Sequence, residues 1–349
     1  MDNGEWRIVG ARYRAAFNEA ASLFALFFLI FTSAASAQLV KSVDAVGMTV
    51  SDMDRAVDFF TNVLSFEKLS DVEVHGSEYE KLQGLFGLRM RVVRLELSME
   101  KIELTQYLTP EGRPIPPEWR SHDHGFQHIA IVVSDMDKAY QRLRNHKVRH
   151  VSTGPQTIPA NNKAAAGIRA FYFKDPDGHN LEIIYFPPGK GDQRWQNSTG
   201  KLFLGIDHTA IVVSNTHNSL EFYRGLLGLK LTGESINHGS EQEHLNNVAG
   251  ARLHISGLKA TAGPGIEFLE YLAPRDGRPA PVGTMANDLW HWQTTLTTDN
   301  AAIAAHKLRQ AKRRLISPGI AELPEKILGF AKGFLARDPD GHGLQFIER

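Results

Sequence analysis

Two eleven-residue stretches of this chain are nearly identical and differ at one residue that could do chemistry. KDPDGHNLEII begins at Lys174 and RDPDGHGLQFI begins at Arg337, and Glu182 in the first corresponds to Gln345 in the second. A carboxylate can bind a cation or accept a proton, whereas an amide offers an oxygen ligand without charge. The difference raises the question of whether the chain carries two similar sites of unequal strength.

The two stretches belong to a repeat that spans most of the chain. HGSEYEKLQGLFG at His75 matches HGSEQEHLNNVAG at His238, a shift of 163 residues (238 − 75), and IELTQYLTPEGRP matches IEFLEYLAPRDGRP. We therefore predict two similar domains, over residues 40–187 and 203–349. Residues 188–202 are rich in Pro, Gly and polar side chains, which is typical of a linker.

Each predicted domain contains the same local pattern twice. Alternating apolar residues in VDAVGMTV predict a strand, Ser51 and Asp52 suit a helix N-cap, and an apolar face at helical spacing follows. The segments that begin at Gln127, Asp207 and, more weakly, Trp292 repeat this plan, and short strand-like runs follow each one. The chain therefore contains four copies of a unit with one strand, one helix and three strands.

These paired modules, with DPDGH ahead of the closing strand, resemble the vicinal oxygen chelate superfamily. Its members include glyoxalase I, methylmalonyl-CoA epimerase, extradiol dioxygenases and bleomycin-binding proteins. The resemblance covers the chain from about residue 40 onward. It implies an α+β fold with four βαβββ modules paired into two vicinal-oxygen-chelate domains. It also implies a divalent metal ion between two modules, bound by side chains of their strands. One fold hosts many reactions, so the reaction stays open.

In the first domain, the resemblance implies three metal ligands. Glu103, His128 and Glu182 match the ligand positions of the family, while Ala45 stands where a histidine is expected. Three protein ligands with an open position suit a catalytic metal. Two carboxylates and one imidazole suit Fe²⁺, Mn²⁺, Zn²⁺, Ni²⁺ or Co²⁺ without choosing among them.

In the second domain, all four implied ligand positions are filled, but two of them carry amides. His208 and Glu267 match the first two positions, and Gln293 and Gln345 match the others, with His291 as the alternative to Gln293. Neutral ligands attract a divalent cation less strongly than carboxylates do. Two sites of unequal affinity, or one working site and one relic, are both compatible with this pattern.

Three residues of the first domain are candidate catalytic groups: Glu103, Glu182 and Tyr172. A metal-bound glutamate can act as a general base on a carbon acid beside a chelated carbonyl. Tyr172 lies ten residues before Glu182, and this spacing resembles that of a tyrosine in the ring-cleaving dioxygenases that acts on substrate oxygen. Phe334 lies near the equivalent place in the second domain, which favours the first domain as the reactive one.

The resemblance implies that the metal chelates vicinal oxygens of a small-molecule substrate and stabilises an enolate-like anion. The carboxylate-rich ligand sets favour proton transfer, as in an isomerase, epimerase or lyase. An extradiol dioxygenase is the first alternative, although oxygen activation usually needs two histidines and one carboxylate, a triad that neither predicted domain contains. A non-catalytic small-molecule binding protein is the second alternative.

The composition argues against several other classes. The 39 basic and 39 acidic residues give a formal net charge of zero, and no long block of like charge occurs, so we expect no nucleic-acid partner. The absence of cysteine excludes disulfides, metal-bound thiolates and a thiol nucleophile. The length of 349 residues is enough for about two domains with packed cores.

The first 37 residues carry the features of a secretory signal peptide. Arg7, Arg12 and Arg14 precede an apolar run that ends in ASAQ, which predicts cleavage after Ala37. An uncleaved anchor is the alternative, but the run is short of the ~20 residues of a spanning helix. We expect a periplasmic or secreted protein without stable membrane association after cleavage. A homodimer stays open, since barrels of this fold can be completed within one chain or across a partner.

Overall fold

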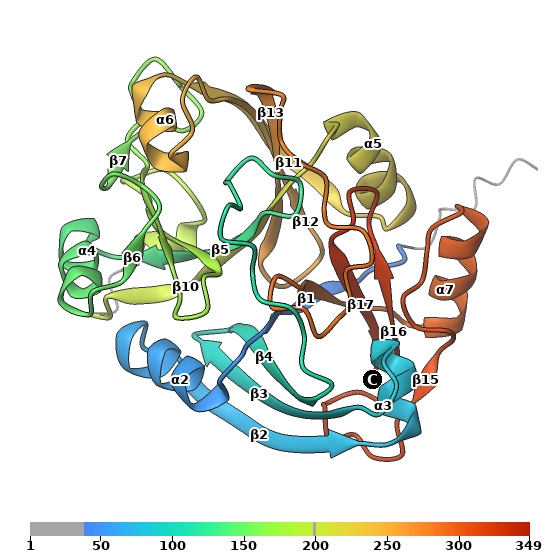
Figure 1. Ribbon diagram of the computed structural model, residues 1–349. Coiled ribbons are helices and arrows are strands. Elements are labelled where there is room, and N and C mark those ends of the chain that lie inside the picture. The colour runs from blue at the N-terminus through green and yellow to red at the C-terminus, as the bar shows by residue number, and fades with distance from the viewer. Residues whose placement is uncertain (1–37, 198–199) are drawn as a thin grey trace, which may run out of the picture. The chain divides into compact units, whose positions relative to one another are not determined.

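Four modules of strand, helix and further strands follow one another along the chain in a computed structural model, coloured from blue to red in Figure 1. The structure describes residues 38–197 and 200–349. The predicted signal peptide and its cleavage site lie outside these residues. Within the described ranges, no helix is both long enough and apolar enough to cross a membrane. The α+β composition of four modules expected from the sequence is confirmed.

The modules share one plan with small variations. The first module consists of β1 (Ser42–Thr49), α2 (Met53–Asp58), the π-helix η1 (Phe59–Val63), β2 (Glu67–His75), α3 (Ser77–Gln83), β3 (Arg89–Leu97) and β4 (Glu100–Thr109). The second consists of β5 (Gln127–Val133), α4 (Met136–Asn145), β6 (Arg149–His150), β7 (Gln156–Thr157), β8 (Arg169–Lys174) and β9 (Asn180–Tyr185).

The short 3-10 helix η2 (Gln193–Gln196) lies in the linker. The third module then consists of β10 (Phe203–Val212), α5 (Thr216–Leu220), the π-helix η3 (Glu221–Leu226), β11 (Lys230–His238), α6 (Ser240–Asn246), β12 (Arg252–Lys259) and β13 (Gly265–Ala273). The fourth consists of β14 (Trp292–Thr297), α7 (Ala301–Gln310), β15 (Ala321–Glu322), β16 (Lys332–Arg337) and β17 (Gly343–Glu348).

A short polar side chain begins the first helix of every module. Asp52 caps α2, Asp135 caps α4, Asn215 caps α5 and Asn300 caps α7, each by accepting a hydrogen bond from a backbone N–H of the first turn. Such a cap satisfies a donor that has no partner inside the helix. The cap predicted at Asp52 is therefore confirmed, and the same local signal recurs three more times.

The four modules build two sheets, and each sheet combines modules from both repeats. Sheet A has the strand order β15-β16-β17-β14-β1-β4-β3-β2, so it joins the first module to the fourth. Sheet B has the order β11-β12-β13-β10-β5-β9-β8-β6, with β7 on β8, so it joins the second module to the third. The two joints are the antiparallel pairs β1–β14 and β5–β10. The middle modules of the chain thus share one sheet, and the outer modules share the other.

The helices α2, α4, α5 and α7 pack against one face of each sheet through large apolar clusters. Phe60 and Phe171 belong to the cluster of the first two modules, and Phe222 and Phe346 belong to that of the last two. Side chains alternate along a strand, so every second residue points to the opposite face. We call this opposite face the inner face, and in sheet B it carries the candidate site.

Two loops, residues 110–126 and 274–291, interlock through a pair of ion pairs that the repeat relates. Arg278 Nη2 lies 2.6 Å from Asp123 Oδ2, and Arg113 Nη2 lies 2.6 Å from Asp288 Oδ2. Burial alone would raise the pKa of Asp123, but Arg278 and backbone N–H groups outweigh burial and lower it to about 2. Each loop is therefore held by the other through a buried carboxylate.

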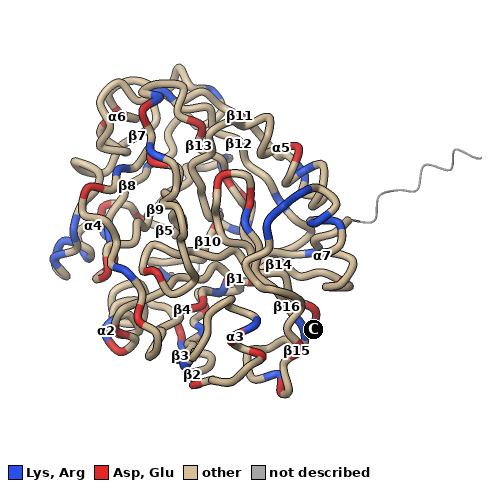
Figure 2. The backbone as a smooth tube through the Cα atoms, turned by 45° about the vertical axis from the view of Figure 1, so that its right-hand side comes forward, with Lys and Arg blue, Asp and Glu red and all other residues tan. Residues whose placement is uncertain are grey.

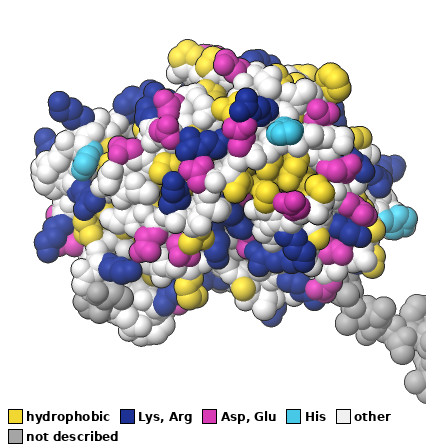
Figure 3. Space-filling model, turned by 90° about the horizontal axis from the view of Figure 1, so that it is seen from below, with side chains coloured by type: hydrophobic (Ala, Val, Ile, Leu, Met, Phe, Trp, Pro, Cys, Tyr) yellow, Lys and Arg dark blue, Asp and Glu magenta, His cyan; other side chains and the backbone are white. Residues whose placement is uncertain are grey.

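Charged side chains of both signs are distributed along the described chain, as Figure 2 shows on the backbone. On the face drawn in Figure 3, basic and acidic side chains are interspersed with hydrophobic ones. The zero formal net charge of the sequence is thus accompanied by local mixing of signs on this face.

Candidate metal centre

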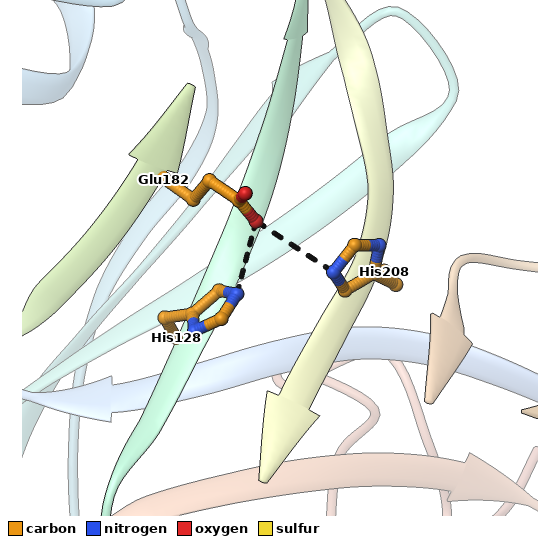
Figure 4. Close-up of side chains that lie close together, drawn as sticks. All are labelled: His128, Glu182 and His208. Carbon is orange, nitrogen blue, oxygen red and sulfur yellow. Dashed lines mark hydrogen bonds and ion pairs between the residues drawn. The ribbon is translucent and has the colours of Figure 1, made fainter. Parts of the chain in front are cut away.

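Four acidic and imidazole side chains meet on the inner face of sheet B. Glu182 comes from β9, His128 from β5, His208 from β10 and Glu267 from β13, which are neighbours in the order β9-β5-β10-β13. Figure 4 shows Glu182 between the two imidazoles, with all three side chains pointing toward one another. The joint between the second and third modules therefore creates the cluster.

Two alanines leave room for these side chains. In the pairing register, Ala210 lies between His128 on β5 and Glu267 on β13, and Ala130 stands opposite His208. Directly opposed residues lie on the same face of a sheet. A larger residue at either position would therefore occupy space on the inner face next to the imidazole. The small neighbours keep the centre of the sheet open for polar groups.

The ligand atoms have separations that suit one shared ion. His128 Nε2 lies 3.1 Å from Glu182 Oε2, and His208 Nε2 lies 3.7 Å from the same oxygen and 3.5 Å from Glu267 Oε1. The ligand atoms of His128, Glu182 and His208 all lie within 4.8 Å of one another. Ligands at about 2.1 Å from an ion in tetrahedral geometry lie about 3.4 Å apart. The cluster thus has the dimensions of a metal site.

His208 is the group of this cluster that carries positive charge, and it lies against two carboxylates. Burial, together with the charge of Glu182, raises the pKa of Glu267 to about 7, against the effect of His208. Burial disfavours a charge on His208, but Glu267, Asp207 and Glu182 outweigh it and raise the pKa of the imidazole to about 10. Burial lowers the pKa of His128, which stays neutral as a metal ligand must. Two carboxylates in so confined a space are stabilised by a nearby cation.

The residues present fit a metal ion. Within the described residues, His208 Nε2 is buried without a hydrogen-bond partner, and buried polar atoms of this kind are uncommon. The unpartnered Nε2 of His208 faces the carboxylates of Glu182 and Glu267. A divalent cation would replace the proton of His208, and it would then balance two neutral imidazoles and two carboxylates, which together carry a charge of about −2.

A second layer of contacts orients His208. Its Nδ1 lies 3.0 Å from Asp207 Oδ2, and Asp207 Oδ1 accepts a hydrogen bond of 2.8 Å from Trp195 Nε1. Trp195 belongs to η2, so the linker itself reaches the candidate site. A carboxylate on the far nitrogen of a ligating histidine fixes the ring orientation and increases the basicity of the ligating nitrogen.

Tyr172 lies beside the cluster, as the sequence led us to expect of a group near Glu182. The two residues are directly paired between β8 and β9, and the Tyr172 ring centroid lies 4.8 Å from that of His128. Burial and the charge of Glu182 raise the pKa of Tyr172 well above its ordinary value. The phenol therefore stays protonated and can donate a hydrogen bond to a substrate oxygen.

The residue of sheet A that corresponds to Tyr172 is Leu335, and Phe334, which the sequence placed near that position, is its neighbour. Leu335 pairs with Gln345 as Tyr172 pairs with Glu182. Phe334 points to the helix-bearing face, where its ring stacks on Phe346.

Sheet A carries a neutral counterpart of the cluster. In the β1–β14 pair of sheet A, Gln293 lies opposite Gly47, just as His128 lies opposite Ala210 in the β5–β10 pair of sheet B. By the same register, Ala45 lies at the position that His208 holds in sheet B. Gln293 Nε2 donates to the Oε1 atom of Gln345 at 3.3 Å, and His291 Nε2 lies 3.4 Å from Gln293 Oε1. One hydrogen bond thus joins the two amides, and Gln345 Nε2 donates to Thr295 Oγ1 at 3.4 Å.

Arg94 supplies the positive charge in the sheet A cluster. Its Nε lies 3.7 Å from Glu103 Oε2, and its Nη2 donates to Asp44 Oδ2 at 2.6 Å. Arg94 pairs with Glu103 between β3 and β4, while in sheet B Gly257 pairs with Glu267 between β12 and β13. The Glu103 side chain is 7% exposed and that of Glu267 is 25% exposed. A guanidinium therefore covers one carboxylate, and a glycine leaves the other accessible.

The structure groups the expected ligands by sheet rather than by repeat. The sequence led us to place Glu103 with His128 and Glu182, and the remaining residues in a second set. The structure instead leaves Glu103 in sheet A with Gln293, Gln345 and Ala45, and it collects in sheet B His128, Glu182, His208 and Glu267. The set of two histidines and one carboxylate, which neither predicted domain contains by itself, is formed in sheet B by residues of both repeats.

The physical reason for the regrouping is that similar modules can pair with either neighbour. The linker allows β10 to lie antiparallel to β5, and no residue pattern within one module records this choice. Sequence reasoning also missed Asp207, Trp195, Arg94 and Gly257. Only Asp207 carried a signal, because it precedes His208 directly. The roles of the other three depend on contacts between distant elements.

Comparisons with known proteins agree with this architecture. The protein-family model described as the Glyoxalase/Bleomycin resistance protein/Dioxygenase superfamily matches this sequence at residues 42–183 and 205–346. A 2-epi-5-epi-valiolone epimerase from Actinomyces sp is 35% identical over 152 residues, which cover 42% of this chain and 81% of that protein. Glyoxalase I from Saccharomyces cerevisiae is 33% identical over 110 residues, 31% of this chain and 29% of that protein. The crystal structure of glyoxalase I from Zea mays has the same fold, with a TM-score of 0.55, 16% identity and coverage of 88% of this chain and 92% of that one.

Proposed function

This chain belongs to the glyoxalase/bleomycin resistance protein/dioxygenase superfamily, and we propose that it is a metal-dependent enzyme that moves a proton at a carbon beside a carbonyl, as isomerases, epimerases and lyases do. The observation that carries the proposal is the cluster of two imidazoles and two carboxylates on the inner face of sheet B. His128, Glu182, His208 and Glu267 would hold one divalent ion. Fe²⁺, Mn²⁺, Zn²⁺, Ni²⁺ and Co²⁺ all suit these ligands.

A bound divalent cation would polarise two neighbouring oxygens of a small substrate and stabilise negative charge that develops on them. The two carboxylates come from different strands, β9 and β13: Glu182 Oε2 lies between the imidazoles, and Glu267 Oε1 lies 3.5 Å from His208 Nε2. One carboxylate is thus placed to remove a proton and the other to return one, which suits epimerisation.

Tyr172 completes the set of groups that act on the substrate. Its protonated hydroxyl would donate a hydrogen bond to a substrate oxygen, where charge increases as the proton leaves the carbon. Burial of His128 and Glu182, at 0% and 4% exposure, keeps water away from the cluster and strengthens these interactions. The relative from Actinomyces sp is named an epimerase, which supports proton transfer here.

A ring-cleaving dioxygenase is the second candidate, and a specific observation favours it. His128, His208 and Glu182 form a set of two histidines and one carboxylate within 4.8 Å, the combination used by non-haem Fe²⁺ oxygenases. Glu267 argues for proton transfer instead, because a fourth protein ligand takes a position that oxygen chemistry needs open.

The first test is the metal content of the chain purified without chelator, measured by elemental mass spectrometry. We expect about one equivalent of divalent metal per chain. Glu182→Ala should lose it, whereas Glu103→Ala is the matched control in sheet A and should keep it. The sequence alone led us to expect that both substitutions abolish binding, so this pair of variants also tests the regrouping.

The identity of the metal and a deuterium assay separate the candidate reactions. Zn²⁺, Ni²⁺, Co²⁺ or Mn²⁺, together with exchange of a substrate C–H in D₂O, would support proton transfer. Fe²⁺ with oxygen uptake on catechols would replace it by the dioxygenase. A chain that takes up no metal even after reconstitution would refute both and leave a small-molecule binding protein.

A further inference from the structure

An extra residue in β10 turns His208 toward the candidate metal centre. Ile206 and His208 lie opposite consecutive residues of β5, so Asp207 between them is unpaired and forms a β-bulge. The Ile206 side chain belongs to the apolar cluster on the helix-bearing face, whereas His208 lies on the inner face. Residues two apart on a regular strand share a face. The bulge is therefore what directs these two side chains to opposite faces.

Glu100, at the start of β4 in sheet A, holds this bulge from the other sheet. Its Oε2 accepts a hydrogen bond of 3.2 Å from the backbone N–H of Ile206, and its Oε1 accepts one from Arg194 Nη1 in the linker. The Glu100 side chain is 3% exposed. An added Cβ at Gly205 would lie 2.5 Å from Glu100 Oε2, so glycine at this position leaves the space that the carboxylate occupies.

Arg194 extends the contact to the residue that orients His208. Its Cζ lies 3.9 Å from the centroid of the Trp195 ring, and Trp195 Nε1 donates to Asp207 Oδ1 at 2.8 Å. Asp207 Oδ2 in turn lies 3.0 Å from His208 Nδ1. The backbone of the bulge and the side chain at its centre are therefore held by one continuous set of contacts, which begins at Glu100.

Sheet A shows that the bulge itself does not require a buried carboxylate. β1 has the equivalent bulge at Asp44 (207 − 163), and the residue that follows it is Ala45. There the N–H of Val43 (206 − 163) donates to the backbone carbonyl of Ala262 at 3.0 Å. A buried carboxylate costs more free energy than a neutral carbonyl does. Of these two bulges, the one that a carboxylate holds is the one that precedes His208.

We propose that Glu100 and Arg194 are positioning residues of the metal centre, which hold the β10 bulge in the form that directs His208 into the ligand cluster. The effect on the metal rests on the proposed function, whereas the orientation of the ring does not. Contacts behind a ligating histidine change metal affinity by about 10- to 100-fold. A carboxylate of sheet A thus sets the affinity of the site in sheet B.

The test compares the parent chain with the double variant Glu100→Met, Arg194→Met. This change removes both charges and keeps apolar bulk, which folds often tolerate at a buried ion pair. The first readout is the nuclear Overhauser contact between the rings of His128 and His208, whose centroids lie 5.9 Å apart, in the metal-free chain. We expect this contact in the parent chain and its loss in the double variant. The second readout is isothermal titration with the metal found in the parent chain, where the dissociation constant should rise about 10- to 100-fold.

Two single substitutions are the controls, and thermal melting checks that each variant folds. Glu100→Gln keeps an acceptor for the N–H of Ile206, so it should retain the ring contact and most of the metal affinity. Asp44→Asn changes the equivalent bulge of sheet A and should leave both readouts unchanged. If the double variant does not fold, Arg194→Met alone, at a side chain that is 34% exposed, takes its place with the same two expected changes.

A ring contact that persists in the double variant of a metal-binding chain would overturn the inference while the proposed function stands. An equal loss of the contact in Asp44→Asn would overturn it as well, because any disturbed bulge would then have the same effect. A parent chain that takes up no metal, but whose ring contact depends on Glu100 and Arg194, would support the positioning role and refute the metal enzyme.

Discussion

Replacing Gly257 by Arg should displace the metal ion from sheet B. Arg94 already has this arrangement in sheet A, where its Nε lies 3.7 Å from the carboxylate of Glu103. Gly257 holds the same register position beside Glu267. The expected mechanism is substitution of one cation by another, since the new guanidinium would pair with Glu267 and repel a divalent ion.

The magnitude follows from the separation seen in sheet A. A pair of unit charges about 4 Å apart interacts by about 4 kcal/mol at an effective dielectric constant of about 20. The guanidinium would neutralise Glu267, so the metal would lose about this much of its attraction to the site. About 1.4 kcal/mol corresponds to a tenfold change in affinity. We therefore expect the dissociation constant of the metal to rise roughly a thousandfold.

Isothermal titration with the metal found in the parent chain measures the change. Gly257→Met is the control, because methionine is long and uncharged and meets the same neighbour, the Thr232 hydroxyl, 3.2 Å from an added Cβ. Thermal melting checks that both variants fold. Unchanged affinity in Gly257→Arg would refute the charge-substitution reasoning, and an equal loss in Gly257→Met would show that bulk rather than charge excludes the ion.

Three further predictions concern other parts of the molecule. Trp195→Phe keeps an aromatic ring but removes the hydrogen bond to Asp207, so metal affinity should fall about tenfold in the same titration, and unchanged affinity would remove the linker from the site. Arg278→Ala should lower the free energy of unfolding by about 2 kcal/mol at neutral pH. Because the folded-state pKa of Asp123 is depressed to about 2, this difference is present above pH about 4 and should shrink in urea titrations toward pH about 2; a pH-independent difference would contradict it. A second equivalent of metal should bind after the combined substitutions Ala45→His, Arg94→Gly, Gln293→His and Gln345→Glu, and a stoichiometry that stays at one would show that register alone does not define the site.

Local features of this fold could be predicted from the sequence, whereas the partners of the modules could not. The cap at Asp52 and the alternation of the strands depend on neighbouring residues, so they are visible in the chain. The pairing of β5 with β10 depends on competition between similar surfaces, because the second module could pair with the first or with the third. The place of Glu103 and the grouping of the ligands depend on this pairing, so the sequence could not predict them.

The difference between Glu182 and Gln345 follows from the sheet to which each belongs. In sheet B, two carboxylates face two imidazoles, of which His208 carries the positive charge, and His208 Nε2 has no hydrogen-bond partner among the described residues. In sheet A, Arg94 lies between Glu103 and Asp44, Arg349 also contacts Asp44, and the amide of Gln293 donates to that of Gln345. A carboxylate at position 345 would add a buried negative charge that no cation in this cluster balances, which is costly. The amide is therefore the residue that a self-neutralised cluster requires, and the carboxylate is the residue that a metal site requires.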